Sequence, residues 1–173
     1  MNSIDRIPLI VKMSEITPNI GKTAVMKCIY LLQTIKQVPL GYRFEIYTYG
    51  PYSSSVMDEI DYARQCGYIS VESLTYPTGQ FGYQIKCNEA GKKYVSGCEL
   101  VSKYSNEINE IMSEFGDKKA TDLELLSTII FVSTVYKLSD KKEITDLVGI
   151  IKPKFDTAYI NEAIDYLKEK TYI

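Results

Sequence analysis

Apolar residues recur at intervals of three and four along most of the chain, a spacing typical of helices with one buried face. In the first forty residues this pattern predicts a helix that begins near Ser3 and ends before Thr17. It also predicts a second helix over residues 23–38, which Pro39 closes.

One stretch alternates between apolar and polar positions, as a strand with one buried face does. It covers residues 42–49 and is followed by the junction YGPYSSS, in which we expect Gly50 and Pro51 to stop the strand. One of the serines at 53–55 can then accept a hydrogen bond from the first free amides of a helix over residues 54–66. Gly67 suits the end of that helix.

A second alternating region predicts a β-hairpin. Residues 68–74 and 81–87 form its strands, and TYPTGQ at 75–80 supplies the turn. Asn88 is a suitable cap for a short helix after it. The order helix, strand, helix, hairpin, helix is the one expected of a winged-helix module.

The rest of the chain is helical by the same three-and-four spacing. The expected helices cover residues 100–115, begin at 121 or 122 and run to 136, begin after 139 or 140 and run to 151, and begin at 156 or 157. We therefore predict an α+β, mostly helical protein. A winged-helix-like module spans residues 1–98, and a helical C-terminal extension over 99–173 packs on it.

The residue types present exclude several chemistries. The chain has no histidine, which removes Ser-His-Asp and Cys-His catalysis and zinc sites that contain histidine. The four cysteines lie 38, 21 and 11 positions apart without a Cys-x-x-Cys pair, so we expect free, mostly buried thiols. They are Cys28, Cys66, Cys87 and Cys98.

Three short motifs invite a functional interpretation, and each has a simpler one. IGKT at 20–23 resembles the end of a phosphate-binding loop, but Ile16 stands where that loop needs glycine, so a helix start is expected. Asp58, Glu59 and Asp61 point in different directions from their helix axis, which indicates a solvated face. The serines at 53–55 have no histidine to activate them. We expect no catalytic residue, metal or cofactor, and keep an enzyme of unrecognised type only as a remainder.

Charge divides unevenly between the two halves. Residues 1–98 hold ten Lys and Arg against eight Asp and Glu, and residues 99–173 hold ten against fourteen. The helix over 54–66, which would face DNA in a winged-helix module, carries three acidic residues and only Arg64. A protein-binding surface fits these charges better than a DNA-binding one.

The fifteen tyrosines suit such a surface, since each joins a large apolar ring to a hydrogen-bonding tip. The candidates for binding a protein partner are Tyr47, Tyr49, Tyr52 and Asp61. The candidates for the alternative, DNA binding, are Arg43, Arg64, Lys86, Lys92 and Lys93.

Two further expectations concern location and assembly. Charged residues interrupt the first sixteen positions, so we expect neither a signal peptide nor a membrane span and place the protein in the cytoplasm. The C-terminal helices are candidates for a homodimer interface, although their apolar residues are more often domain core. The residues concerned are Leu125, Ile129, Val132, Ile160, Ile164 and Leu167.

Two segments resemble a known family. VMKCIYLLQ at 25–33 and FEIYTYGPYSSSVMDEI at 44–60 resemble the bacterial YwgA-like family of predicted winged-helix regulators and, more distantly, the Panacea or SocA-like antitoxin domain. The resemblance covers residues 20–97, and Lys27 is the one basic residue at a helix position where the family usually has a polar-basic pair. The resemblance implies a regulatory or antitoxin-like protein, often associated with mobile elements or phage defence, and supplies no catalytic residue.

The leading hypothesis is therefore a non-enzymatic antitoxin, immunity component or regulatory adaptor that acts through protein contacts. The alternative is a winged-helix transcriptional regulator that binds DNA as a dimer.

Overall fold

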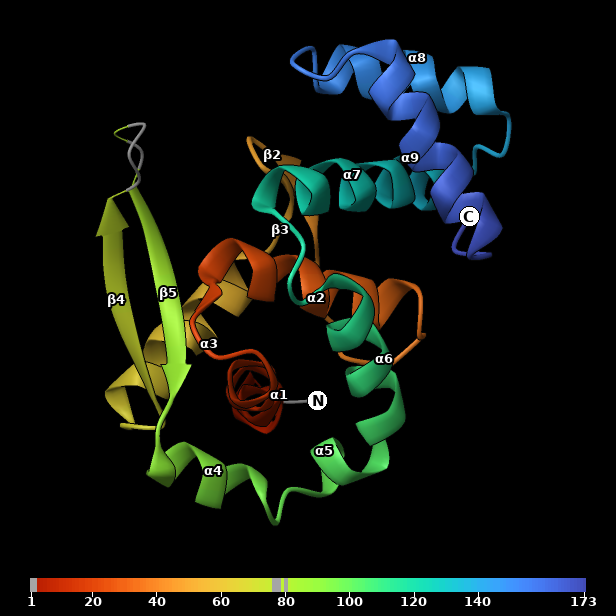
Figure 1. The fold of residues 1–173 in the computed structure, drawn as a ribbon. Coiled ribbons are helices and arrows are strands. Elements are labelled where there is room, and N and C mark those ends of the chain that lie inside the picture. Colours follow the sequence, from red (N-terminus) through yellow and green to blue (C-terminus); the bar gives the residue numbers. More distant parts are fainter. Residues whose placement is uncertain (1–2, 76–78, 80) are drawn as a thin grey trace.

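The first helix, α1 (Ser3–Ile16), forms the centre of the N-terminal part of the computed structural model, which describes residues 3–75, 79 and 81–173. Figure 1 views α1 along its axis, with the neighbouring elements arranged as a ring around it. Leu9, Ile10, Val11 and Met13 are fully buried. A helix enclosed in this way needs apolar residues around most of its circumference, and the sequence supplies them.

A three-stranded antiparallel sheet lies beside this ring. It contains β1 (Ile20–Gly21), β4 (Ile69–Thr75) and β5 (Phe81–Cys87) in the order β1-β5-β4. The hairpin expected from the alternating pattern is confirmed, with pairs running from Ile69 opposite Cys87 to Thr75 opposite Phe81. The predicted turn TYPTGQ falls largely on residues 76–78 and 80, which lie outside the described residues.

The junction YGPYSSS is built differently from the prediction. The strand expected over residues 42–49 is a short hairpin, made of β2 (Glu45–Tyr47) and β3 (Gly50–Tyr52) with the turn at 48–49. Gly50 and Pro51 therefore belong to a strand and do not stop one. Proline is tolerated here because both strands of a two-stranded sheet are edge strands.

The helix α3 (Ser54–Gln65) follows this hairpin. Ser53 occupies its N-cap position, but within the described residues its side chain makes no capping hydrogen bond, so the expected serine cap is wrong in that respect. Gly67 takes a positive φ of 73° just after the helix, and its amide donates to Arg64 O at 3.0 Å. The predicted glycine end of the helix is confirmed.

Most of the other helices have the predicted bounds to within a few residues. The second helix is an exception, because it ends at Thr34 and Gln37 has a non-helical φ of 54°, so the prediction that it reaches residue 38 and is closed by Pro39 is wrong. The second helix, α2 (Lys22–Thr34), begins at the IGKT segment, so that segment is a helix start as expected. The one expected helix over residues 100–115 is divided at Tyr104, whose φ of −111° departs from helical geometry. The others are α4 (Glu89–Val95), α5 (Glu99–Lys103), α6 (Ser105–Phe115), α7 (Ala120–Tyr136), α8 (Lys141–Ile151) and α9 (Thr157–Glu169).

Helix α7 joins the two parts of the chain. It packs against α2 and β3 on one side and against α8 and α9 on the other (Figure 1). Buried apolar residues from both parts form one continuous cluster. The six residues offered for a dimer interface, Leu125, Ile129, Val132, Ile160, Ile164 and Leu167, are buried in this cluster. They are core residues, because one monomer already covers them.

The α+β, mostly helical class is thus confirmed, while the boundary near residue 98 stays a prediction. Contacts of α5, α6 and α7 with α1 and α2 cross that boundary. Cys28 is buried, Cys87 and Cys98 are half-buried and Cys66 is exposed, so the thiols are free but not mostly buried. Among the described residues, no helix combines the length and the apolar character needed to cross a membrane.

Candidate functional site

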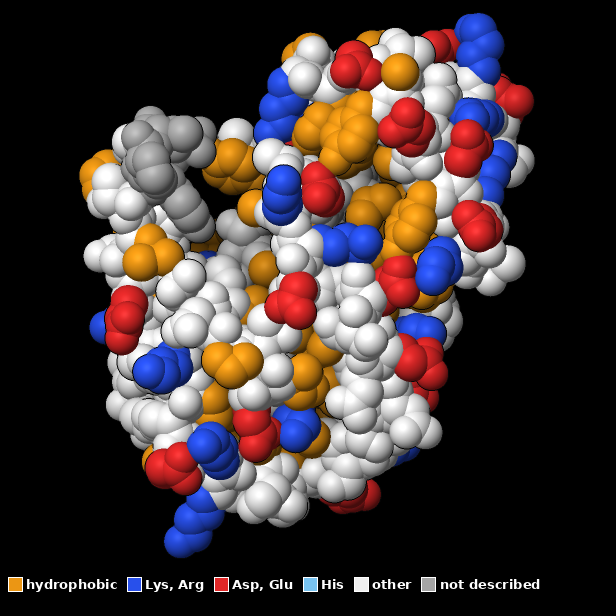
Figure 2. Space-filling model, viewed as in Figure 1, with side chains coloured by type: hydrophobic (Ala, Val, Ile, Leu, Met, Phe, Trp, Pro, Cys, Tyr) orange, Lys and Arg blue, Asp and Glu red, His pale blue; other side chains and the backbone are white. Residues whose placement is uncertain are grey.

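Three tyrosines stand out from the β2–β3 hairpin. The exposed fractions are 67% for Tyr47, 61% for Tyr49 and 37% for Tyr52. The rings of Tyr47 and Tyr52 lie across the hairpin from one another, with centroids 5.7 Å apart. We call these three residues the tyrosine surface. In Figure 2, apolar side chains are exposed beside this hairpin and over α7 and α9, with charged groups between them.

A buried lysine holds one strand of this hairpin. Lys27, on α2, is only 2% exposed, and its ammonium donates to Pro51 O at 2.6 Å. Burial lowers its pKa to about 8, an effect that nearby Glu124 partly opposes and Lys152 reinforces. The lone basic residue of the segment VMKCIYLLQ therefore binds the backbone of β3 inside the protein.

A second buried lysine holds the turn. Lys152, just after α8, donates to the carbonyl oxygens of Tyr47, at 3.0 Å, and Thr48. Its ammonium also lies 3.0 Å from Glu124 Oε1 on α7, and this contact is ionic because within the described residues that oxygen accepts no hydrogen bond. We call Lys27, Glu124 and Lys152 the anchor cluster.

Lys154 extends the anchor cluster to the surface. Its ammonium lies 2.8 Å from Glu124 Oε2 and 5.9 Å from the centre of the Tyr49 ring. Glu124 thus has a cation at each of its two carboxylate oxygens. Removing it would leave the buried Lys152 without its ion-pair partner and the buried Lys27 without a nearby negative charge. Such a loss is far more costly than that of an exposed ion pair.

Gly50 brings β3 against α7. Its φ is +86°, and a Cβ built there would lie 3.0 Å from Thr128 Oγ1 and 3.3 Å from Glu124 O. Both the backbone conformation and the close approach favour glycine. The Gly-Pro pair therefore docks the hairpin on α7, and the tyrosine surface projects from a fixed base.

Glu59 belongs to a second buried network, so the prediction that it lies on a solvated face is wrong. We expected Glu59 on a solvated face with Asp58 and Asp61, but it is buried and receives two bonds from Arg6, of which Nε–Oε1 is 3.1 Å. Tyr42 OH donates to its other oxygen, and the Arg6 guanidinium carbon lies 3.9 Å from the centre of the Tyr42 ring. Burial raises the pKa of both Glu59 and Tyr42. This network ties α1 to α3 and to the segment before β2.

The other residues predicted to bind a partner or DNA lie outside the β2–β3 hairpin. Asp61 is half-buried and pairs with Lys22 at 3.2 Å. The candidates for DNA contact are all exposed, on the loop before β2 (Arg43), α3 (Arg64), β5 (Lys86) and α4 (Lys92 and Lys93). Among the described residues, no group of three or more His, Cys, Asp or Glu side chains is placed to hold a metal ion.

The sequence reasoning missed the anchor cluster, although a signal for it exists. Lys27 is a single charge inside a long apolar helical stretch, and Glu124 lies between two leucines near the start of α7. Charged side chains are rarely buried unless they are paired. Lys152 gives no such signal, because it follows the end of a helix in a charged segment. Only the fold shows that it turns inward.

Comparison with known proteins adds no assignment. No family model matches the chain, and no curated protein matches it significantly. The resemblance to the YwgA-like family consequently stays a prediction from the two segments that carry it.

Proposed function

We propose that this is a non-enzymatic regulatory or antitoxin/immunity-type protein of the cytoplasm that acts by binding a protein partner through its tyrosine surface. The observation that carries the proposal is the exposure of three tyrosines on a hairpin whose backbone is fixed from inside by two buried lysines. Tyrosine is among the residues most enriched at the energetic centres of interfaces.

Rigidity is the second argument for a binding role. A side chain that is already held in place loses less conformational entropy when a partner binds. Here the backbone beneath Tyr47 and Tyr52 is fixed by Lys152 and Lys27, and the Lys154 ammonium lies near the Tyr49 ring. Such an arrangement favours recognition over catalysis, because Lys27 and Lys152 bind backbone carbonyls and, among the described residues, no nucleophile with a paired base lies beside the tyrosines.

Co-purification from the native host tests the proposal. The tagged wild-type chain should recover a stoichiometric protein, and the double variant Tyr47→Ala/Tyr49→Ala should lose it. The matched control is Phe81→Ala/Tyr83→Ala, which removes two exposed aromatic rings from the other hairpin. The control should keep the partner, and both variants should unfold at nearly the wild-type temperature since all four side chains are exposed.

Two results would contradict the proposal. One is recovery of the same partner at the same yield by the folded Tyr47→Ala/Tyr49→Ala variant. The other is an absence of any stoichiometric protein, even after chemical crosslinking in cells.

DNA binding remains the second candidate, because the structure removes part of the argument against it. Glu59 is buried and Asp61 is paired with Lys22, so α3 presents less free negative charge than its sequence suggests. The pairing of β1 with the β4–β5 hairpin supports a winged-helix-like arrangement. Lys86 is exposed on that hairpin.

A gel-shift assay at moderate salt decides this alternative. Sequence-dependent retardation of the promoter that precedes the protein's own gene would support it. Reversing Lys92 and Lys93 to Glu should then weaken binding and flatten its salt dependence. Reversing Lys142 and Lys168, which are exposed on α8 and α9, provides the matched control. Retardation that is equal on unrelated DNA would reject specific binding.

A further inference from the structure

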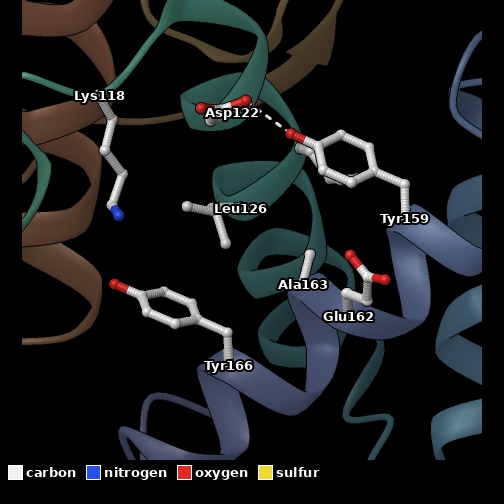
Figure 3. A pocket seen from close by; sticks show the side chains of 8 residues that line it. Lys118, Asp122, Leu126, Tyr159, Glu162, Ala163 and Tyr166 are labelled. Carbon is white, nitrogen blue, oxygen red and sulfur yellow. Dashed lines mark hydrogen bonds between the residues drawn. The ribbon is translucent and has the colours of Figure 1, made fainter.

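A pocket opens on the surface between α7 and α9. Its volume is about 220 Å³, and Leu126 and Ala163 form an apolar floor (Figure 3). Tyr159 and Tyr166 stand on either side of this floor. The pocket thus combines an apolar base with two aromatic walls, the form that binding pockets for single side chains commonly take.

Hydrogen bonds hold both aromatic walls in place. Tyr159 OH donates to Asp122 Oδ1 at 2.6 Å, and this bond raises the pKa of Tyr159 to about 12. Tyr166 OH donates to Glu114. Each phenol therefore has its hydrogen-bonding tip engaged within the protein, while its ring lines the pocket.

The charges at the rim are asymmetric. The Lys118 ammonium lies on one side, 4.9 Å from the centre of the Tyr166 ring. The carboxylate of Glu162 lies on the opposite side, next to Tyr159 (Figure 3). Glu162 is exposed and makes no hydrogen bond or ion pair with any described residue. The side formed by Tyr159, Glu162 and Asp122 therefore presents negative charge beside an aromatic ring.

The pocket is continuous with the tyrosine surface. The Phe155 ring lies 5.8 Å from the Tyr159 ring, measured between centroids. The Lys154 ammonium is 5.1 Å from the centre of Phe155 and 5.9 Å from that of Tyr49. A chain of side chains in contact thus leads from the hairpin to the pocket. A partner seated on the tyrosine surface would reach the pocket with a neighbouring segment.

We propose that this pocket receives an arginine side chain of the protein partner, an inference that rests on the proposed function. The aliphatic stem of arginine matches the floor of Leu126 and Ala163. Its planar guanidinium can stack on Tyr159 and pair with Glu162 at the same time, which the compact ammonium of lysine does less well. The surplus of Asp and Glu over Lys and Arg in residues 99–173 also favours a basic segment.

Titration with small probes, followed by NMR of the backbone amides, tests the pocket without the partner. The two probes are N-acetyl-arginine methylamide and N-acetyl-citrulline methylamide, which have nearly the same shape and differ in charge. The arginine probe should give saturable shifts at residues 122–126 and 159–166, and the citrulline probe should give much smaller ones. Glu162→Gln should weaken binding of the arginine probe roughly two- to fivefold, the loss expected for one partly exposed ion pair.

Glu169→Gln is the matched control, because Glu169 is an exposed carboxylate on the same helix outside the pocket. It should leave the affinity unchanged. Equal shifts with both probes, no saturable shift, or equal loss in the two variants would each overturn the inference.

The two proposals can fail separately. If the arginine probe binds as expected but Tyr47→Ala/Tyr49→Ala still captures the partner, the pocket stands and the tyrosine surface is rejected. If the probe does not bind while the tyrosine variant loses the partner, the proposed function stands and the arginine pocket is rejected.

Discussion

The two hairpins of this protein, β2–β3 and β4–β5, differ in length and in what holds them. The β4–β5 hairpin pairs seven residues on each strand and gains a third strand, β1, along its edge. The β2–β3 hairpin pairs only three. Isolated two-stranded hairpins are marginal in water even when they are longer than this. The short hairpin therefore depends on groups outside it.

Those groups are side chains from three helical regions. Lys27 from α2 and Lys152 from the end of α8 bind hairpin carbonyls, and Glu124 from α7 supplies the negative charge between them. The comparison teaches that one hairpin is specified locally by its alternating sequence, while the other is imposed by distant residues. The tyrosine surface is on the imposed one, so its geometry should respond to mutations far away in sequence.

The largest effect is expected from Glu124→Gln. This change leaves Lys152 and Lys27 buried without their anion, and we expect the free energy of unfolding to fall by about 3–5 kcal/mol. Urea denaturation at neutral pH measures it. The control is Glu110→Gln, which removes an exposed pair with Lys36 and should cost at most about 1 kcal/mol. Equal losses in the two variants would show that the anchor cluster does not stabilise the fold.

Lys152→Met should loosen the short hairpin selectively. It removes the bonds to the Tyr47 and Thr48 carbonyls and the ion pair with Glu124, which keeps its pair with Lys154, and should cost about 2–3 kcal/mol. Hydrogen exchange should quicken at residues 45–52 and stay unchanged at 69–75 and 81–87. Lys142→Met, at an exposed position on α8, is the control and should change neither hairpin. Equal acceleration in both hairpins would mean that they unfold together and that the comparison is wrong.

Lys27 should make stability depend on pH in the alkaline range. Its pKa is lowered from 10.5 to about 8 in the folded protein, so between these values the unfolded chain binds more protons. The contribution of Lys27 to stability should therefore rise by about 2 kcal/mol from pH 8 to pH 10. Cys28, Tyr30 and Tyr42 act in the opposite direction in this range, because burial raises the pKa of each and the unfolded chain loses those protons first.

Urea denaturation at several pH values compares the wild type with Lys27→Met. The unfolding free energy of the wild type relative to the variant should increase by about 2 kcal/mol from pH 8 to pH 10, since methionine carries no proton to lose and the other groups are the same in both proteins. The same pH dependence in the two proteins would show that Lys27 does not contribute.

The smallest expected effect is the difference between two glycine-to-alanine changes. One would only strain the backbone, and the other would also press on a neighbouring helix. Gly50 and Gly67 both have positive φ, but a Cβ at Gly67 would meet none of the described residues within 4 Å, whereas one at Gly50 would press on α7. Gly67→Ala should cost about 1 kcal/mol from backbone strain alone. Gly50→Ala should cost about 1 kcal/mol more because of the contact with Thr128. Thermal unfolding measures both, and equal shifts would mean that β3 moves away from α7 without cost.

Much of the fold follows from local patterns. The three-and-four spacing places most helices within a few residues of their observed bounds. The side chains of Asn88, Asp140 and Asp156 each accept a hydrogen bond from a backbone amide, as expected of a helix cap. The β4–β5 hairpin follows from alternation. These elements are predictable because the groups that define them lie within a few residues of one another.

Two of the wrong predictions share one cause. The sequence YGP suggests a strand that stops, but β3 exists because Lys27 binds Pro51 O and Gly50 fits against α7. Asp58, Glu59 and Asp61 look alike along the helix, yet Glu59 alone meets Arg6 and Tyr42. Pro51, Gly50 and Glu59 each have their decisive partner more than ten positions away, where no local pattern reaches.

From the sequence alone one can therefore predict the class of the protein, the approximate positions of most helices, the long hairpin and the lack of any histidine for catalysis. Hydrophobic periodicity and capping are local, so they can be read along the chain. The tertiary structure decided that the aromatic segment is a hairpin, that Lys27, Glu59 and Glu124 are buried, and that α7 and α9 form a pocket beside the tyrosines. Burial and pairing of charge depend on which distant segments meet, and only the folded chain brings them together.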